Sequence, residues 1–205
     1  MYRILSLDGG GAWALIEVQA LTRLFGGGNT RGHDVLRQFD LVAANSGGSL
    51  VLGGLVENLT LGEVADLFLS AATRSAIFSK VGMFEYQVDK ALNFGPKYRS
   101  DAKLDALKRI LVNTGGTPFN ELHVPGRSGD PIHLLVTAYE YDSNRAAFFR
   151  SGGTSGPAWG EGASSTVTLA EALHASSNAP INFFDAPAKL DSCDQRLGWS
   201  GVRDE

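Results

Sequence analysis

Cysteine is almost absent from this chain of 205 residues, since Cys193 is the only one. A single cysteine excludes an internal disulfide and is typical of proteins in a reducing compartment, so we expect a cytoplasmic location. The first residues carry no pattern of a cleaved signal peptide. Secretion by a route without such a signal stays open as the alternative.

Long apolar runs and basic clusters are missing as well. No stretch approaches the roughly 20 apolar residues that a membrane-spanning helix needs. The net charge is -4, and no group of Lys and Arg is concentrated enough to predict a nucleic-acid partner. The acidic balance also means that any peripheral membrane contact would be apolar or driven by a partner. No His or Cys spacing indicates a metal, and we expect neither metal nor cofactor. No feature predicts an oligomeric state.

What is present has the composition of an ordinary globular protein, with 43% hydrophobic residues, and the length suits one domain over 1–205. Thr60 and Glu63 form a capping-box pattern, and Ser100 or Asp101 is expected to cap a later helix. Strand and helix alternate from the N-terminus, which predicts a parallel sheet with helices on both faces. The expected strands are 2–7, 39–43, 131–141 and 146–150, and the expected helices are 13–25, 47–57, 60–72, 100–112 and 168–177.

Three consecutive glycines, Gly9, Gly10 and Gly11, follow the first strand and precede a helix. Glycines allow close approach to the backbone, and N–H groups at such a strand-to-helix turn can hold an anion. A flexible turn is the plain structural explanation. The spacing Gly9-x-Gly11-x-x-Ala14 also fits a relaxed dinucleotide fingerprint, but the acidic residue expected about 20 positions later is missing.

Ser46 follows the second strand, within Ala44-Asn45-Ser46-Gly47-Gly48. A serine on a sharp turn between strand and helix, with small residues two positions before and after it, is typical of a nucleophile elbow. An ordinary serine-glycine loop is the alternative for this motif alone. Beside a glycine loop that supplies oxyanion donors, Ser46 indicates an enzyme of acyl transfer.

These motifs resemble those of the patatin-like phospholipases. The resemblance rests on Leu5-Ser6-Leu7-Asp8-Gly9-Gly10-Gly11, on Phe39-Asp40-Leu41-Val42-Ala43-Ala44-Asn45-Ser46-Gly47-Gly48-Ser49, and on Ala172-Leu173-His174-Ala175-Ser176-Ser177-Asn178-Ala179-Pro180. It implies a three-layer α/β/α sandwich with a mostly parallel central sheet. It also implies hydrolysis of lipid or other acyl esters, as in phospholipases A, lysophospholipases and esterases, by a Ser-Asp dyad without histidine or metal. Ser46 would be the nucleophile, and Gly9, Gly10 and Gly11 would form the oxyanion hole.

The chain departs from the family pattern in two places. The family's glycine loop usually continues x-Arg-Gly, whereas Trp13 and Ala14 stand here. No Asp-Gly dipeptide follows Pro180, and Ser200 takes the position of the family's catalytic Asp. We therefore expect the chain to lack the family's C-terminal elements and expect Asp194 to act as the base. The alternatives are Asp191, Asp204 or no base at all.

Other hypotheses stay open from the sequence. His174 could complete a Ser-His-Asp triad, although a lone helical histidine is more often structural. The aromatic stretch 78–97 could line an acyl pocket or pack as a lid. A patatin-like domain that has lost its base could instead bind lipid or a partner, and a nucleotide-binding domain is a remote alternative.

Overall fold

The computed structural model describes residues 1–77, 98–141, 144–151, 167–179, 184–190 and 193–198, the last of these by its backbone alone. The described helices and strands are β1 (Ile4–Leu7), η1 (Gly11–Ala14), α1 (Leu15–Leu24), α2 (Gly32–Leu36), β2 (Leu41–Asn45), α3 (Gly47–Val56), α4 (Leu61–Leu69), α5 (Ala71–Ile77), α7 (Ser100–Ile110), η2 (Phe119–Glu121), β3 (His133–Glu140), β4 (Arg145–Arg150), α8 (Leu169–Ser176), β5 (Ala188–Leu190) and β6 (Cys193–Gly198).

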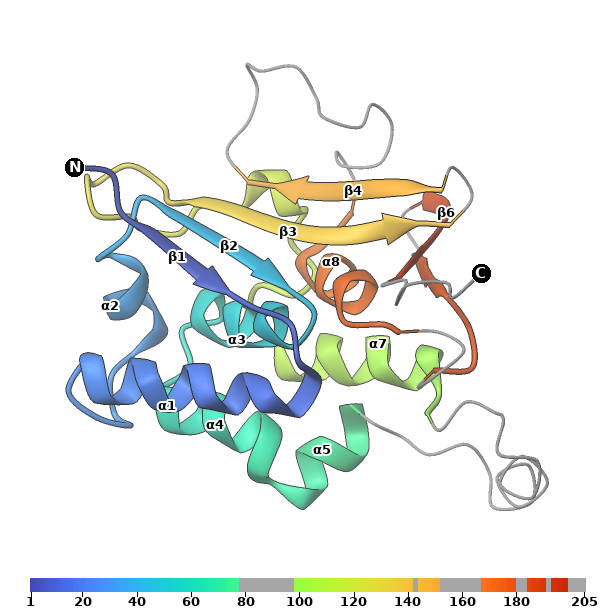
Figure 1. Cartoon of the computed structure of the whole chain (residues 1–205), viewed down its shortest axis with the longest axis horizontal. Helices are drawn as coiled ribbons and strands as arrows, with labels where there is room; N and C mark the ends of the chain where they lie inside the picture. Colours follow the sequence, from blue (N-terminus) through green and yellow to red (C-terminus); the bar gives the residue numbers. More distant parts are fainter. Residues whose placement is uncertain (78–97, 142–143, 152–166, 180–183, 191–192, 199–205) are drawn as a thin grey trace.

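The sheet is built on three adjacent parallel strands, β1, β2 and β3, with β4 antiparallel on the outer edge of β3 (Figure 1). The last two residues of β3 also pair with β6, which runs antiparallel to it, and β5 pairs with β6. Two parallel crossovers place the carboxyl ends of β1 and β2 side by side, so the turns that leave these strands meet at one end of the sheet.

The core lies between the sheet and the helices α3 and α8, which contact the three parallel strands directly. Side chains alternate along β2 and β3, so that Val42, Ala44, Leu134 and Val136 are buried. Every residue of α3 is buried. In Figure 1, α1, α4 and α7 lie beyond these central helices. A helix that is apolar all round, as α3 is, can be stable only inside such a core.

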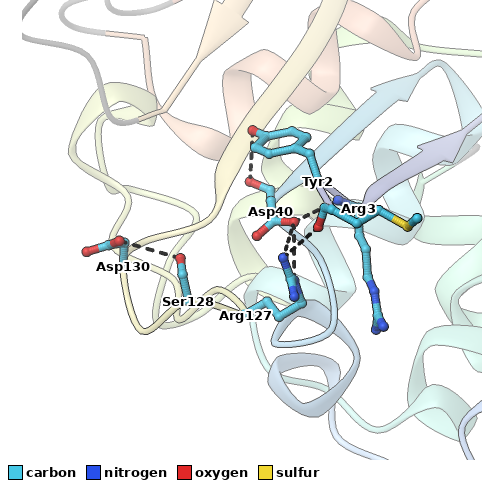
Figure 2. Close-up of polar contacts among 7 residues, drawn as sticks. Tyr2, Arg3, Asp40, Arg127, Ser128 and Asp130 are labelled. Atoms are coloured by element: carbon cyan, nitrogen blue, oxygen red, sulfur yellow. Dashed lines mark hydrogen bonds and ion pairs between the residues drawn. The ribbon is translucent and has the colours of Figure 1, made fainter.

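The opposite end of the sheet is closed by polar contacts around Asp40, drawn in Figure 2. The Asp40 carboxylate accepts the N–H of Arg3 at 2.7 Å and pairs with the Arg127 guanidinium at 3.1 Å. Arg127 also donates to the Met1 carbonyl at 2.8 Å. This cluster therefore ties the start of β1, the start of β2 and the loop before β3 together, far along the strands from Ser46.

Most of the expected elements are present, but several differ. The helix expected at 60–72 ends at Leu69, and α5 begins at Ala71. The elements α2, β5 and β6 were not expected. The strand expected at 39–43 begins at Leu41 and continues to Asn45. The expected cap of the helix at 100–112 is wrong, because Ser100 and Asp101 lie inside α7 after Arg99. The N–H of Ser100 instead donates to the carboxylate of Asp185, at 2.8 Å, from 85 residues farther along the chain.

Candidate active site

Ser46 lies on the turn between β2 and α3 with backbone angles of φ 49 and ψ -117. A positive φ is uncommon for a residue with a side chain and is typical of strained functional turns. The Ser46 side chain is half-buried, and the N-terminus of α3 begins at the next residue. The helix dipole therefore favours negative charge developing beside this serine.

The glycine loop packs directly on this turn. A Cβ placed on Gly9 would lie 3.2 Å from the Ser46 Cβ, and one placed on Gly47 would lie 2.4 Å from the Gly11 carbonyl oxygen. The N–H of Gly48 donates to the Asp8 carbonyl at 3.0 Å, which locks the two turns together. In the described part of the chain, no acceptor engages the N–H groups of Gly9 and Gly10. The structure thus brings Ser46 beside the exposed loop Gly9–Gly11.

A carboxylate borders this loop on the side of α1. Glu17 accepts the Asp8 N–H through Oε1 at 2.5 Å, and its Oε2 is buried without a partner among the described residues. Burial raises the pKa of Glu17, and the nearby Asp8 carboxylate adds to the rise, while the bond from the Asp8 N–H opposes it. The sequence motifs gave no signal for this residue.

The hydrogen bond between Ser176 and Ser46 is a second feature that the motifs did not predict. The Ser176 Oγ accepts the N–H of Ser46 at 2.9 Å, across 130 residues of sequence. Ser176 is the last residue of α8 and is fully buried. It lies within the third segment of the family resemblance, but nothing in that pattern showed what it would touch.

The register of the strands places the backbone of Asp194 away from Ser46. Asn45 of β2 lies opposite Thr137 of β3. Gly198 of β6 lies opposite Tyr139, on the same edge of β3 as β2. Asp194 comes four residues before Gly198, about 13 Å back along an extended strand and away from Ser46. Asp191, Ser200 and Asp204 lie outside the described residues.

His174 does not contact Ser46. It is buried on α8, with Nε2 3.5 Å from the Ser100 Oγ, and its Nδ1 has no partner among the described residues. Burial lowers the pKa of His174 well below its ordinary value, and nearby Lys103 lowers it further. The Nζ of Lys103, whose side chain is fully buried, donates to the His174 carbonyl oxygen at 3.4 Å. These contacts indicate a structural role for His174 and do not support the Ser-His-Asp alternative.

Apolar side chains are exposed along η1 and α1, beside the exposed polar residues Gln19 and Arg23. Trp13, Ile16 and Leu24 keep 76%, 62% and 75% of their surface exposed, whereas Val18 and Leu21 are buried. We call Trp13, Ile16, Ala20 and Leu24 the α1 stripe, since helical spacing places them on one face. The stripe begins beside the glycine loop, where a Cβ on Gly10 would contact the Trp13 Cβ at 3.4 Å.

The described residues offer neither a metal-binding cluster nor a membrane-spanning helix. No group of three or more His, Cys, Asp or Glu side chains that could hold a metal ion occurs among them. None of the helices that the structure describes combines the length and apolarity of a membrane span. The aromatic stretch 78–97, offered as a pocket wall or lid, lies outside the described residues.

Comparison with solved structures supports the fold. VipD from Legionella pneumophila matches with a TM-score of 0.52 and 13% identity, over 99% of this chain and 46% of VipD. The type III effector protein ExoU matches with a TM-score of 0.44 and 14% identity, over 86% of this chain and 39% of ExoU. The chain thus spans less than half of either protein. With VipD as the guide, the predicted class, an α/β/α sandwich with a mostly parallel sheet, is confirmed.

Comparison with protein families gives the identity. A search of curated proteins finds no match. Residues 5–199, however, match the family described as Patatin-like phospholipase. This range includes the glycine loop, the turn at Ser46 and the helix α8, the three places where the sequence resembles that family. The chain therefore belongs to the patatin-like phospholipase family.

Proposed function

We propose that this chain hydrolyses acyl esters of lipids, with Ser46 as the nucleophile. The observation that carries the proposal is the contact between a strained, half-buried serine and an exposed glycine loop. A Cβ added at Gly9 would lie only 3.2 Å from the Ser46 Cβ. Such a turn presents a hydroxyl at the end of a sheet, and the loop offers N–H donors where an oxyanion would form.

The reaction takes two steps. The Ser46 Oγ attacks the ester carbonyl carbon and passes its proton to a carboxylate, while the N–H groups of Gly9 to Gly11 stabilise the oxyanion by about 3 kcal/mol per donor. The intermediate collapses, and the leaving alcohol takes up the proton. Water then attacks the acyl-serine, giving a fatty acid and regenerating the Ser46 hydroxyl.

A fluorophosphonate probe tests the nucleophile directly. Wild-type protein should be labelled on Ser46, as located by mass spectrometry, and Ser46→Ala should lose both label and ester hydrolysis. Ser128→Ala is the matched control, because Ser128 lies in the loop at the opposite end of the sheet (Figure 2). Undiminished turnover in folded Ser46→Ala protein would rule the mechanism out.

The identity of the base is a separate question. Asp194 stays the prediction from the sequence, although the register of β6 places it away from Ser46. Asn substitutions of Asp191, Asp194 and Asp204 compare the three carboxylates. The variant that removes the acidic limb of the kcat/KM pH profile identifies the base. If all three variants keep the wild-type profile, none of these carboxylates serves.

The α1 stripe supports contact with a lipid surface. An exposed Trp followed by aliphatic residues on one helix face suits the boundary between headgroups and acyl chains. We expect Trp13→Ser/Ile16→Ser protein to lose sedimentation with neutral phosphatidylcholine vesicles while still hydrolysing a water-soluble ester. Val112→Ser removes an equally exposed apolar side chain elsewhere, at 77% exposure, and should sediment like wild type. Equal sedimentation of all three proteins would contradict the contact.

A second candidate function is a lipid-binding domain that has lost catalysis. The sequence favours it, because no Asp-Gly dipeptide follows Pro180 and Ser200 stands where the family pattern has its catalytic Asp. Absence of fluorophosphonate label on folded wild-type protein, together with label on Ser200→Asp, would establish this alternative. Label on both proteins would instead support the hydrolase. A cytoplasmic location stays a prediction for either function.

A further inference from the structure

The backbone of the Ser46 turn is held from two sides. On one side, Ser49 Oγ and the Ser49 N–H both donate to the Ser46 carbonyl, at 2.6 and 3.0 Å. On the other side, the Ser46 N–H donates to the Ser176 Oγ at 2.9 Å. The Ser49 contacts are local to the start of α3, whereas the Ser176 contact comes from a distant helix.

Among the described residues, Ser176 is the one acceptor for the Ser46 N–H. Ser176 is fully buried and Ser46 is half-buried, so removing the hydroxyl would leave a partly buried N–H without its protein partner. Loss of a hydrogen bond at a partly buried N–H is unfavourable, and a strained turn can relieve that cost by rotating. Rotation of this peptide would move the Ser46 side chain away from Gly9.

The helix that carries Ser176 is itself firmly anchored. Thr168 and Glu171 form a capping box at the start of α8, and all eight residues of the helix are buried. Near its end, the Lys103 ammonium lies against the His174 carbonyl, two residues before Ser176. The acceptor for the Ser46 N–H is therefore fixed in space before any substrate arrives.

We infer that Ser176 is a positioning residue for the Ser46 nucleophile. By accepting the Ser46 N–H, it holds the turn in its strained conformation and sets the direction of the Ser46 Oγ relative to the donors at Gly9 and Gly10. The inference rests on the proposed function and goes beyond it by assigning the residue that keeps the nucleophile in reacting geometry.

The test compares Ser176→Ala with Ser177→Ala. Ser177 is the matched control, because it is the next residue and its hydroxyl donates to the Leu173 carbonyl instead of the turn. We expect Ser176→Ala to lower kcat on a soluble ester by about 10- to 100-fold with KM unchanged, as misplacement of a reacting group does. The Ser177→Ala protein should keep the wild-type kcat. Equal kcat values for the two variants would overturn the inference.

Amide hydrogen exchange gives a readout that needs no activity. Exchange in the peptide that contains Ser46 should quicken in Ser176→Ala and stay at the wild-type rate in Ser177→Ala, and unchanged exchange in both would overturn the contact. If Ser176→Ala does not fold, Ser176→Cys retains the volume with a weaker acceptor and should show the same two effects in smaller measure. Failure of wild-type protein to react with the fluorophosphonate would refute the hydrolase, while the exchange result would still decide whether Ser176 holds the turn.

Discussion

At the scale of single residues, the protonation of Glu17, which contacts the start of the glycine loop, makes the stability of the protein depend on pH. The Glu17 carboxylate accepts the Asp8 N–H, but burial raises its pKa above the usual 4.5. The folded protein therefore binds this proton more tightly than the unfolded chain does. The stability that follows from the raised pKa is fully present below pH 4.5 and is lost as the pH rises through the folded value.

We predict that Glu17→Gln removes this pH dependence. The amide keeps an acceptor for the Asp8 N–H and carries no charge, so the variant should gain stability relative to wild type as the pH rises from about 4 to 8. Urea unfolding across that range measures the difference in the free energy of unfolding. A difference that stays constant with pH would contradict the assigned shift.

At the scale of elements, α4 shows how local sequence can specify a helix start. Thr60 accepts the Glu63 N–H through its Oγ1, and the Glu63 carboxylate accepts the Thr60 N–H at 2.7 Å. Both halves of the predicted capping box are present. Each satisfies a backbone donor that the helix cannot satisfy by itself.

We predict that Thr60→Ala lowers the free energy of unfolding by about 0.5–2 kcal/mol, the usual effect of losing such a cap. Thr22→Ala is the control, because Thr22 lies inside α1 and bonds back to the Val18 carbonyl, so its loss should be nearly neutral. Chemical denaturation compares the two variants. An effect of Thr60→Ala no larger than that of the control would mean that the rest of the fold holds α4 without its cap.

Sequence reasoning succeeded where the determining residues are neighbours in the chain. The turn at Ser46, the glycine loop and the Thr60 cap depend on residues within a few positions, and each could be predicted. The cap of α7 could not, because its acceptor is Asp185. Strands β5 and β6 were missed because they are short and lack the alternating apolar pattern that predicts a strand.

The same limit applies to the candidate site. Within the helix expected at 13–25, apolar spacing alone does not tell an outer face from a buried one, since Trp13, Ile16 and Leu24 are exposed and Leu21 is buried. Ser176 could not be given a role because its partner lies 130 residues away. Asp194 stays a prediction, and the pairing of β6 with β3 that positions its backbone was not indicated by the sequence.

At the scale of the whole molecule, Asp40 ties three distant segments together at the end of the sheet opposite the site (Figure 2). The Arg3 N–H, followed by the Arg127 guanidinium, lowers the pKa of Asp40 below its usual 3.8. Because the folded-state pKa is lowered, the contribution to stability is present above about pH 4 and is lost as the pH falls through the folded value.

We therefore predict that Asp40→Asn lowers the Tm at pH 7, and that the difference from wild type shrinks below about pH 4 as the wild-type carboxylate is protonated. Asp34→Asn is the control, since Asp34 pairs with Arg37 on one exposed helix and joins no distant segments. Exposed pairs of this kind contribute little. Equal Tm values for Asp40→Asn and wild type at pH 7 would show that the three segments are held by other contacts.

The close packing of Gly47 on Gly11 has a consequence for how such a protein can change over time. A methyl group at 47 would collide with the backbone of the glycine loop, whose own atoms cannot withdraw without moving β1. A side chain at 47 is therefore excluded by the backbone at Gly11, although about 35 residues of chain separate the two positions. In a library randomised at 9–11 and 46–48, we expect functional survivors to keep Gly47, while variation accumulates on the outer face of α1. We therefore expect the two turns to be conserved together, and substitutions that change substrate preference to occur at other positions.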